Sequence, residues 1–158
     1  MTRKSHFEYE LQPVLLRRQW DLDALKLDLN KVNEALTRVT QESVELQRKA
    51  EAVGNEWKNQ SLTSDNIVAD RFSTVLYYLD DVARRLKEID AKKAELDAAR
   101  ESIIDRIALA QRSLDAIEQH RDEMQERFMK QRMNIEFKVA DDHWSMLQTN
   151  TENHDHQS

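Results

Sequence analysis

Few side chains in this sequence have the type and spacing that chemistry requires. Its 158 residues include one glycine and no cysteine. A phosphate-binding loop or a dinucleotide fingerprint needs two or three glycines at fixed spacings, and cysteine nucleophiles and cysteine zinc sites need a thiol. These counts argue against a conventional nucleotide-hydrolysing enzyme and exclude disulfides.

The histidines are also poorly placed for a metal or an acid–base site. Glu118 and His120 are two residues apart, so they point to different sides of a helix. His154 and His156 stand in a polar tail and are by themselves a weak metal signal. No HExxH motif and no calcium loop occurs in the sequence. We therefore expect no catalytic residue, no metal and no cofactor.

The composition is instead typical of long solvated helices. Hydrophobic residues make up 39%, charged residues 34% and aromatic residues 6%, with a single proline. No apolar run approaches the roughly 18 to 20 residues that span a bilayer, and no apolar signal core follows the N-terminus. A net charge of −6 disfavours broad nucleic-acid binding, which depends on cations that neutralise phosphates. We expect a protein that neither inserts into membranes nor binds nucleic acid, and the absence of cysteine is compatible with the cytosol.

Apolar residues recur at heptad spacing along two long segments, as in the seam between paired helices. In the first segment, twelve of the fourteen seam positions from 11 to 57 are apolar. The seam of the second segment runs from 68 to 135 and is interrupted by Gln131 and three basic residues. This pattern predicts an all-α fold, an elongated antiparallel two-helix coiled-coil hairpin with a longer C-terminal helix.

Proline, glycine and polar residues predict where these helices begin and end. Pro13 is tolerated in a first helical turn, where its missing N–H would have no partner. Gly54 and the polar stretch that follows form the one break between the segments, with Thr63, Ser64 or Asp65 as a helix cap. The predicted parts are an N-terminal arm (1–12), a first helix (13–57), a turn (58–66), a second helix (67–140) and a disordered polar tail (148–158).

Two of the basic seam residues are candidates for fixing the register of the hairpin. A charge at a seam position usually lowers stability while it favours one pairing over others. With a turn centred near Leu62, residue i lies opposite about 123 − i, which places Lys93 near Asp28 and Arg100 near Asp21. We expect these pairs to lock the register; ordinary solvated charges are the alternative.

The same register leaves the second helix without cover from about position 112. An exposed apolar stripe on such a protein normally indicates a partner, and methionines suit an adaptable interface. We predict a protein-docking surface here, with self-association or simple solvation as alternatives. The candidate contact residues are Leu114, Ile117, Arg121, Met124, Arg127, Phe128, Arg132 and Ile135.

A second contact is predicted near the turn, where Tyr77 and Tyr78 fall outside the seam. Paired aromatic residues are enriched in interfaces. Two tyrosines that shield the side of the coil are an equally good interpretation.

The order of these parts resembles the FliJ and YscO/SctO family of type III secretion stalk proteins. FEYELQPVLLRR at 7–18 opens the shorter helix, and RFMKQRMN at 127–134 begins the charged end of the longer one. The resemblance spans about residues 7–147 and is mainly one of architecture and heptad pattern. The pI of about 5.4 departs from the more basic stalks of this family.

The resemblance implies a monomeric, non-enzymatic stalk at the cytoplasmic face of a flagellar or injectisome export apparatus. Members of this family insert into the hexameric export ATPase and contact the export gate, and some also bind secretion chaperones. The docking residues of the second helix would then contact the ATPase, and Tyr77 and Tyr78 the export gate. A generic coiled-coil adaptor or homodimeric scaffold of another assembly is the alternative.

Overall fold

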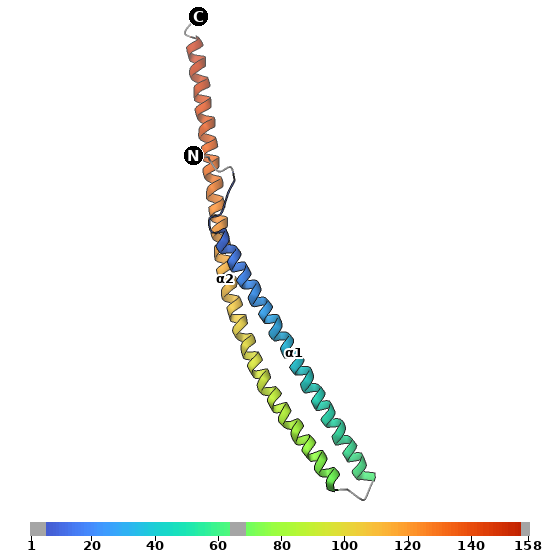
Figure 1. Ribbon diagram of the computed structural model, residues 1–158. Helices are drawn as coiled ribbons and strands as arrows, with labels where there is room; N and C mark the ends of the chain where they lie inside the picture. The colour runs from blue at the N-terminus through green and yellow to red at the C-terminus, as the bar shows by residue number, and fades with distance from the viewer. Residues whose placement is uncertain (1–5, 64–68, 156–158) are drawn as a thin grey trace. The chain divides into compact units, whose positions relative to one another are not determined.

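The structure, a computed structural model, describes residues 6–63 and 69–155 and consists almost entirely of two helices (Figure 1). Helix α1 is Gln12–Thr63, with 52 residues, and helix α2 is Ala69–Asp155, with 87 residues. No strand occurs within these described ranges. The predicted all-α hairpin with a longer second helix is therefore confirmed.

The chain divides into two compact units, and each unit contains residues of both helices. The hairpin unit is Asp21–Leu109, and the terminal unit combines Met1–Trp20 with Ala110–Ser158. In the hairpin unit α1 and α2 lie side by side (Figure 1). Its buried residues all occupy predicted seam positions, which confirms the heptad pattern as the origin of the core: Leu22, Val39, Ser43, Val82 and Ile89.

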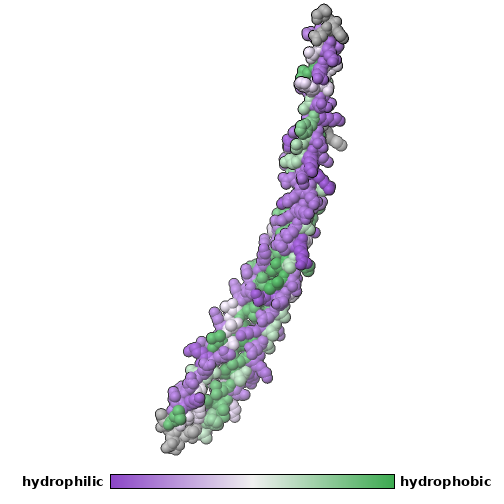
Figure 2. All heavy atoms as spheres, turned by 180° about the vertical axis from the view of Figure 1, so that it is seen from behind, coloured by the Kyte–Doolittle hydropathy of each residue, from purple (hydrophilic) through white to green (hydrophobic). Residues whose placement is uncertain are grey.

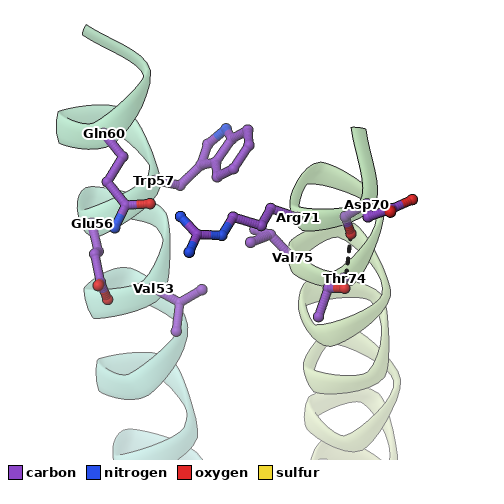
Figure 3. A pocket seen from close by; sticks show the side chains of 8 residues that line it. All are labelled: Val53, Glu56, Trp57, Gln60, Asp70, Arg71, Thr74 and Val75. Atoms are coloured by element: carbon purple, nitrogen blue, oxygen red, sulfur yellow. Dashed lines mark hydrogen bonds between the residues drawn. The ribbon is translucent and has the colours of Figure 1, made fainter. Parts of the chain in front are cut away.

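The register of the hairpin unit is set by contacts near the turn. The rings of Trp57 and Phe72 pack with their centroids 5.6 Å apart. Val53 and Val75 line the two sides of the same pocket (Figure 3). Residue i of α1 therefore lies opposite about 129 − i of α2, six residues away from the predicted register. Six helical residues correspond to about 9 Å along the helix axis.

This shift removes the predicted register lock. Lys93 lies opposite a position about eight residues beyond Asp28, and Arg100 is displaced from Asp21 by the same amount. The predicted pairs were wrong because α1 continues through Leu62 to Thr63. Helix-forming and polar residues after Trp57 extend α1, and the pairing of the two helices shifts with its end.

The predicted break was also wrong over its described part. Gly54 lies inside α1, and residues 58–63 continue the helix. The Ser61 hydroxyl donates to the Lys58 carbonyl at 2.9 Å, so this polar side chain bonds within the helix instead of ending it. Thr63, one of the proposed caps, is the last residue of α1. Ser64, Asp65 and the rest of the predicted turn lie outside the described residues.

Helix α2 is longer than predicted, continuing past 140 through most of the supposed disordered tail to Asp155. The hydroxyls of Thr149 and Thr151 each donate to the carbonyl four residues earlier at 2.6 Å. Residues 141–155 contain neither glycine nor proline, so nothing in the backbone stops the helix. Residues 156–158 lie outside the described part.

Ion pairs on the surface of the hairpin unit join residues of one helix. Arg48 donates to Glu45 at 2.8 Å and lowers the pKa of that carboxyl group through the hydrogen bond and the opposite charge. Asp81 accepts from Arg84 at 2.7 Å and raises the pKa of that guanidinium in the same way. These exposed pairs solvate each helix and do not hold the two helices together.

Candidate protein-binding surface

The terminal unit is built where the start of α1 packs on α2. Leu15 is only 2% exposed, and Leu114 and Ile117 are each 6% exposed. Arg18, a charged seam residue, is half-buried and donates from Nη1 to the Ser113 carbonyl at 2.8 Å. The charge at this seam position is thus accommodated by a backbone acceptor on the opposite helix.

The arm before α1 also packs on α2, further toward the C-terminal end of α2 than the start of α1 does. The Tyr9 hydroxyl lies 2.6 Å from Nδ1 of His120 and 3.4 Å from the Ile117 carbonyl oxygen. Further out, the rings of Phe7 and Phe128 pack with centroids 5.8 Å apart. Residues 6–11 of the arm are not helical, and extended chain advances about twice as far per residue as a helix. A few arm residues therefore reach as far as Phe128.

This cover corrects the predicted overhang. Leu114 and Ile117 are buried, so they are not docking residues, and Arg121, Met124 and Phe128 are half-buried. The exposed part of α2 begins after Phe128 and not at about 112. The prediction was wrong because the register is shifted and because the extended arm reaches further than its residue count suggests. Of the eight candidates, Arg127, Arg132 and Ile135 are exposed.

Beyond Phe128, every side chain described from Met129 to His154 is exposed. We call residues 129–155 the distal segment. Hydrophobic side chains reach the surface along it, as Figure 2 shows near the C-terminal end of α2. On the seam side the apolar series ends at Ile135, which is 44% exposed. The positions that follow on this side, Lys138 and Asp142, are charged.

A second apolar series follows another face of the distal segment, and only its methionines, Met129 and Met133, were recognised from the sequence as suited to an interface. We call it the distal row. Its large members are between 50% and 67% exposed. The other members were missed because only seam positions were followed, although the steps of three and four residues along the row are a helical signal in themselves. The distal row consists of Met129, Met133, Phe137, Ala140, Trp144 and Leu147.

The distal row faces away from the arm. At about 100° per residue, its mean direction lies roughly 150° around α2 from the seam residues Ile117, Met124 and Phe128. Phe7 contacts the seam side, at Phe128. The distal segment therefore presents two separate apolar surfaces, a short one that continues the seam and a longer one on nearly the opposite side.

Basic residues flank these surfaces, two of them in ion pairs along α2. Lys130 lies 3.7 Å from Glu126, and Arg132 lies 3.5 Å from Glu136. These pairs are exposed and span one helical turn, so their net contribution to stability is small. Their charges remain available to a partner that desolvates them.

The predicted contact near the turn lies in the hairpin unit, separate from the distal segment. Tyr77 is 77% exposed, whereas Tyr78 is half-buried beside the coil. Tyr77 can therefore act as a contact, and Tyr78 fits the alternative interpretation of a shielding residue. The two tyrosines therefore differ in exposure, and only Tyr77 is open to a partner.

A pocket between the helices near the turn shows no catalytic arrangement (Figure 3). Arg71 extends from α2 toward α1 and ends between Trp57 and Val53, while the Asp70 side chain points away from α1 (Figure 3). Among the described residues no three acidic, histidine or cysteine side chains come together as a metal site. Neither helix, over the part described, has an apolar stretch that could cross a bilayer.

Comparison with protein-family models, with curated proteins and with solved structures finds no match. A proposal for the function therefore has to rest on the sequence and on the exposed surface of the chain.

Proposed function

We propose that this chain is a non-enzymatic stalk of a type III export apparatus, which binds the hexameric export ATPase and contacts the export gate at the cytoplasmic face of the membrane. The sequence resemblance over residues 7–147 supports this proposal. The structural observation that carries it is the distal segment, a single helix that continues beyond its cover with all its described side chains exposed. A lone helix is narrow enough to enter the centre of a ring of subunits.

The residues proposed to meet the ATPase are the predicted contact residues that are exposed, Arg127 just before the distal segment and Arg132 and Ile135 within it. Arg127 and Arg132 offer charge-assisted hydrogen bonds to acidic groups, and Ile135 offers an apolar contact. A stalk of this kind can change the state of the ring only by binding one state more tightly than another. Arg121, Met124 and Phe128, which are half-buried, could contribute only if the arm moved away.

The test is to mix the chain with its cognate export ATPase and to measure hexamer formation and ATP hydrolysis. We expect the chain to increase both and Ile135→Asp to lose most of the increase. Ile104→Asp is the matched control, since Ile104 is 40% exposed against 44% for Ile135 but belongs to the hairpin unit. A folded chain that leaves the ATPase unchanged would refute the proposal in favour of a generic coiled-coil adaptor.

The contact with the export gate is assigned to Tyr77 because its side chain is 77% exposed. Tyr77→Ala should weaken binding of the gate protein without a change in thermal unfolding. Tyr78→Ala, at the half-buried neighbour, should instead lower the unfolding temperature. Equal gate binding by wild type and Tyr77→Ala would remove Tyr77 from the interface.

A further inference from the structure

We propose that the distal row is a self-association surface, through which the distal segments of two copies of this chain pair side by side in opposite directions. This goes beyond the stalk function and uses a face that the function does not assign. It concerns the chain outside the ring, because a paired distal segment is no longer a lone helix. The family resemblance implies a monomer, with self-association of the uncovered helix as an alternative. The distal row adds an apolar surface of several helical turns on the other side of α2.

The spacing of the distal row is nearly the same when read backwards. A two-fold axis between positions 138 and 139 would place Phe137 opposite Ala140 and Met133 opposite Trp144, and would bring Met129 within one residue of Leu147. Each of the first two layers combines a large side chain with a small or adaptable one, which is the complementarity that a tightly packed interface needs. Because the two copies are related by a two-fold axis, each of these contacts occurs twice in the dimer.

The charges of the distal segment favour the same arrangement. Residues 129–138 contain three basic residues and one acidic residue, whereas residues 139–155 contain four acidic residues and no lysine or arginine. Antiparallel pairing lays the basic half of each copy along the acidic half of the other. Parallel pairing would bring like charges together, which is unfavourable. Charge complementarity therefore identifies the occupant of the distal row as a second copy in the antiparallel orientation.

The pairing requires no rearrangement of the described structure. The distal row lies on the side of α2 away from the arm residues Phe7 and Tyr9, and its large side chains are already exposed. The contacts of Phe7 with Phe128 and of Tyr9 with His120 stay in place when the row is covered. Self-association and the seam-side contacts can thus be altered by separate substitutions.

The first experiment measures the molar mass of the full chain by analytical ultracentrifugation over about a hundredfold range of concentration. We expect a monomer–dimer equilibrium that added salt weakens. Combining Phe137→Ala with Trp144→Ala should raise the dissociation constant about a hundredfold and leave the helix content intact, because both residues are exposed. Ile135→Ala, on the seam side, is the matched control and should leave the constant unchanged.

The second experiment tests the orientation and uses the absence of cysteine from the chain. Met133→Cys and Trp144→Cys chains are mixed under mild oxidation, each carrying a different tag. Antiparallel pairing gives the mixed disulfide between positions 133 and 144, whereas parallel pairing gives each chain crosslinked to its own kind.

A monomer at every concentration, a dimer insensitive to the paired alanine substitutions, or crosslinks only between like chains would each overturn the proposal. The stalk function is measured separately, as ATPase stimulation by dilute chain, so its failure does not imply failure of the pairing.

Discussion

At the scale of single residues, Phe7 joins the arm to α2 by packing on Phe128. We expect Phe7→Ala to lower the free energy of unfolding of the terminal unit by about 1–2 kcal/mol, since an aromatic pair and its buried area are lost. Urea unfolding followed by circular dichroism measures this change.

Phe137→Ala, measured in dilute solution, is the matched control for Phe7→Ala because Phe137 is 67% exposed. The arm would not be packed on α2 if the two alanine variants behaved alike.

Tyr9 and His120 form the polar contact of the arm, with the hydroxyl 2.6 Å from Nδ1. Tyr9→Phe and His120→Ala should each destabilise the terminal unit, and the double variant should cost less than the sum of the two. A coupling energy of about 0.5–1.5 kcal/mol is expected for one hydrogen bond. Additive effects in this double-mutant cycle would show that the two side chains do not interact in solution.

At the scale of the helices, Gly54 is a weak point inside α1. A Cβ added at Gly54 would meet no atom within 4 Å, and the φ angle of Gly54 is not positive. Gly54→Ala should therefore raise the stability of the hairpin unit by about 1 kcal/mol, through its higher helix propensity and a less flexible unfolded chain. Thermal unfolding measures the effect. A lower unfolding temperature would mean that the chain bends or opens at this residue.

The seam could be predicted from the sequence because burial in a helix pair follows the heptad directly. Leu22, Val82 and Ile89 are buried where the spacing placed them. The register could not be predicted, since it depends on where α1 ends. Residues 58–63 are polar yet helical, because they satisfy their hydrogen bonds within the helix and need no core.

The docking residues could be predicted only in part. Ile135 is exposed as expected, but Ile117 is buried under an arm whose extended conformation has no periodic signal. Phe137 and Trp144 lie outside the heptad frame of the seam, so a search along one frame passes over them. A second set of apolar residues at helical spacing on the same helix indicates a second face that can bind a partner. Such a set has to be searched for separately from the seam.

At the scale of the whole molecule, the chain combines well-packed and solvent-surrounded helix in one fold. Backbone amides of residues 129–155 should exchange hydrogen faster in dilute solution than those that flank Leu15, Val39 or Ile89, because only packed helix gains protection from tertiary contacts. Hydrogen exchange followed by mass spectrometry measures this difference. Uniform protection along α2 in dilute solution would contradict it.

The three tryptophans give each part of the chain its own optical signal. Trp20 is 66% exposed near the start of α1, Trp57 packs on Phe72 near the end of α1, and Trp144 is 62% exposed in the distal segment. Chains that keep one tryptophan and carry phenylalanine at the other two positions would report on these regions through fluorescence. Pairing through the distal row should shift the emission of Trp144 to shorter wavelength and leave that of Trp57 unchanged, so self-association and folding can be followed separately without an added dye.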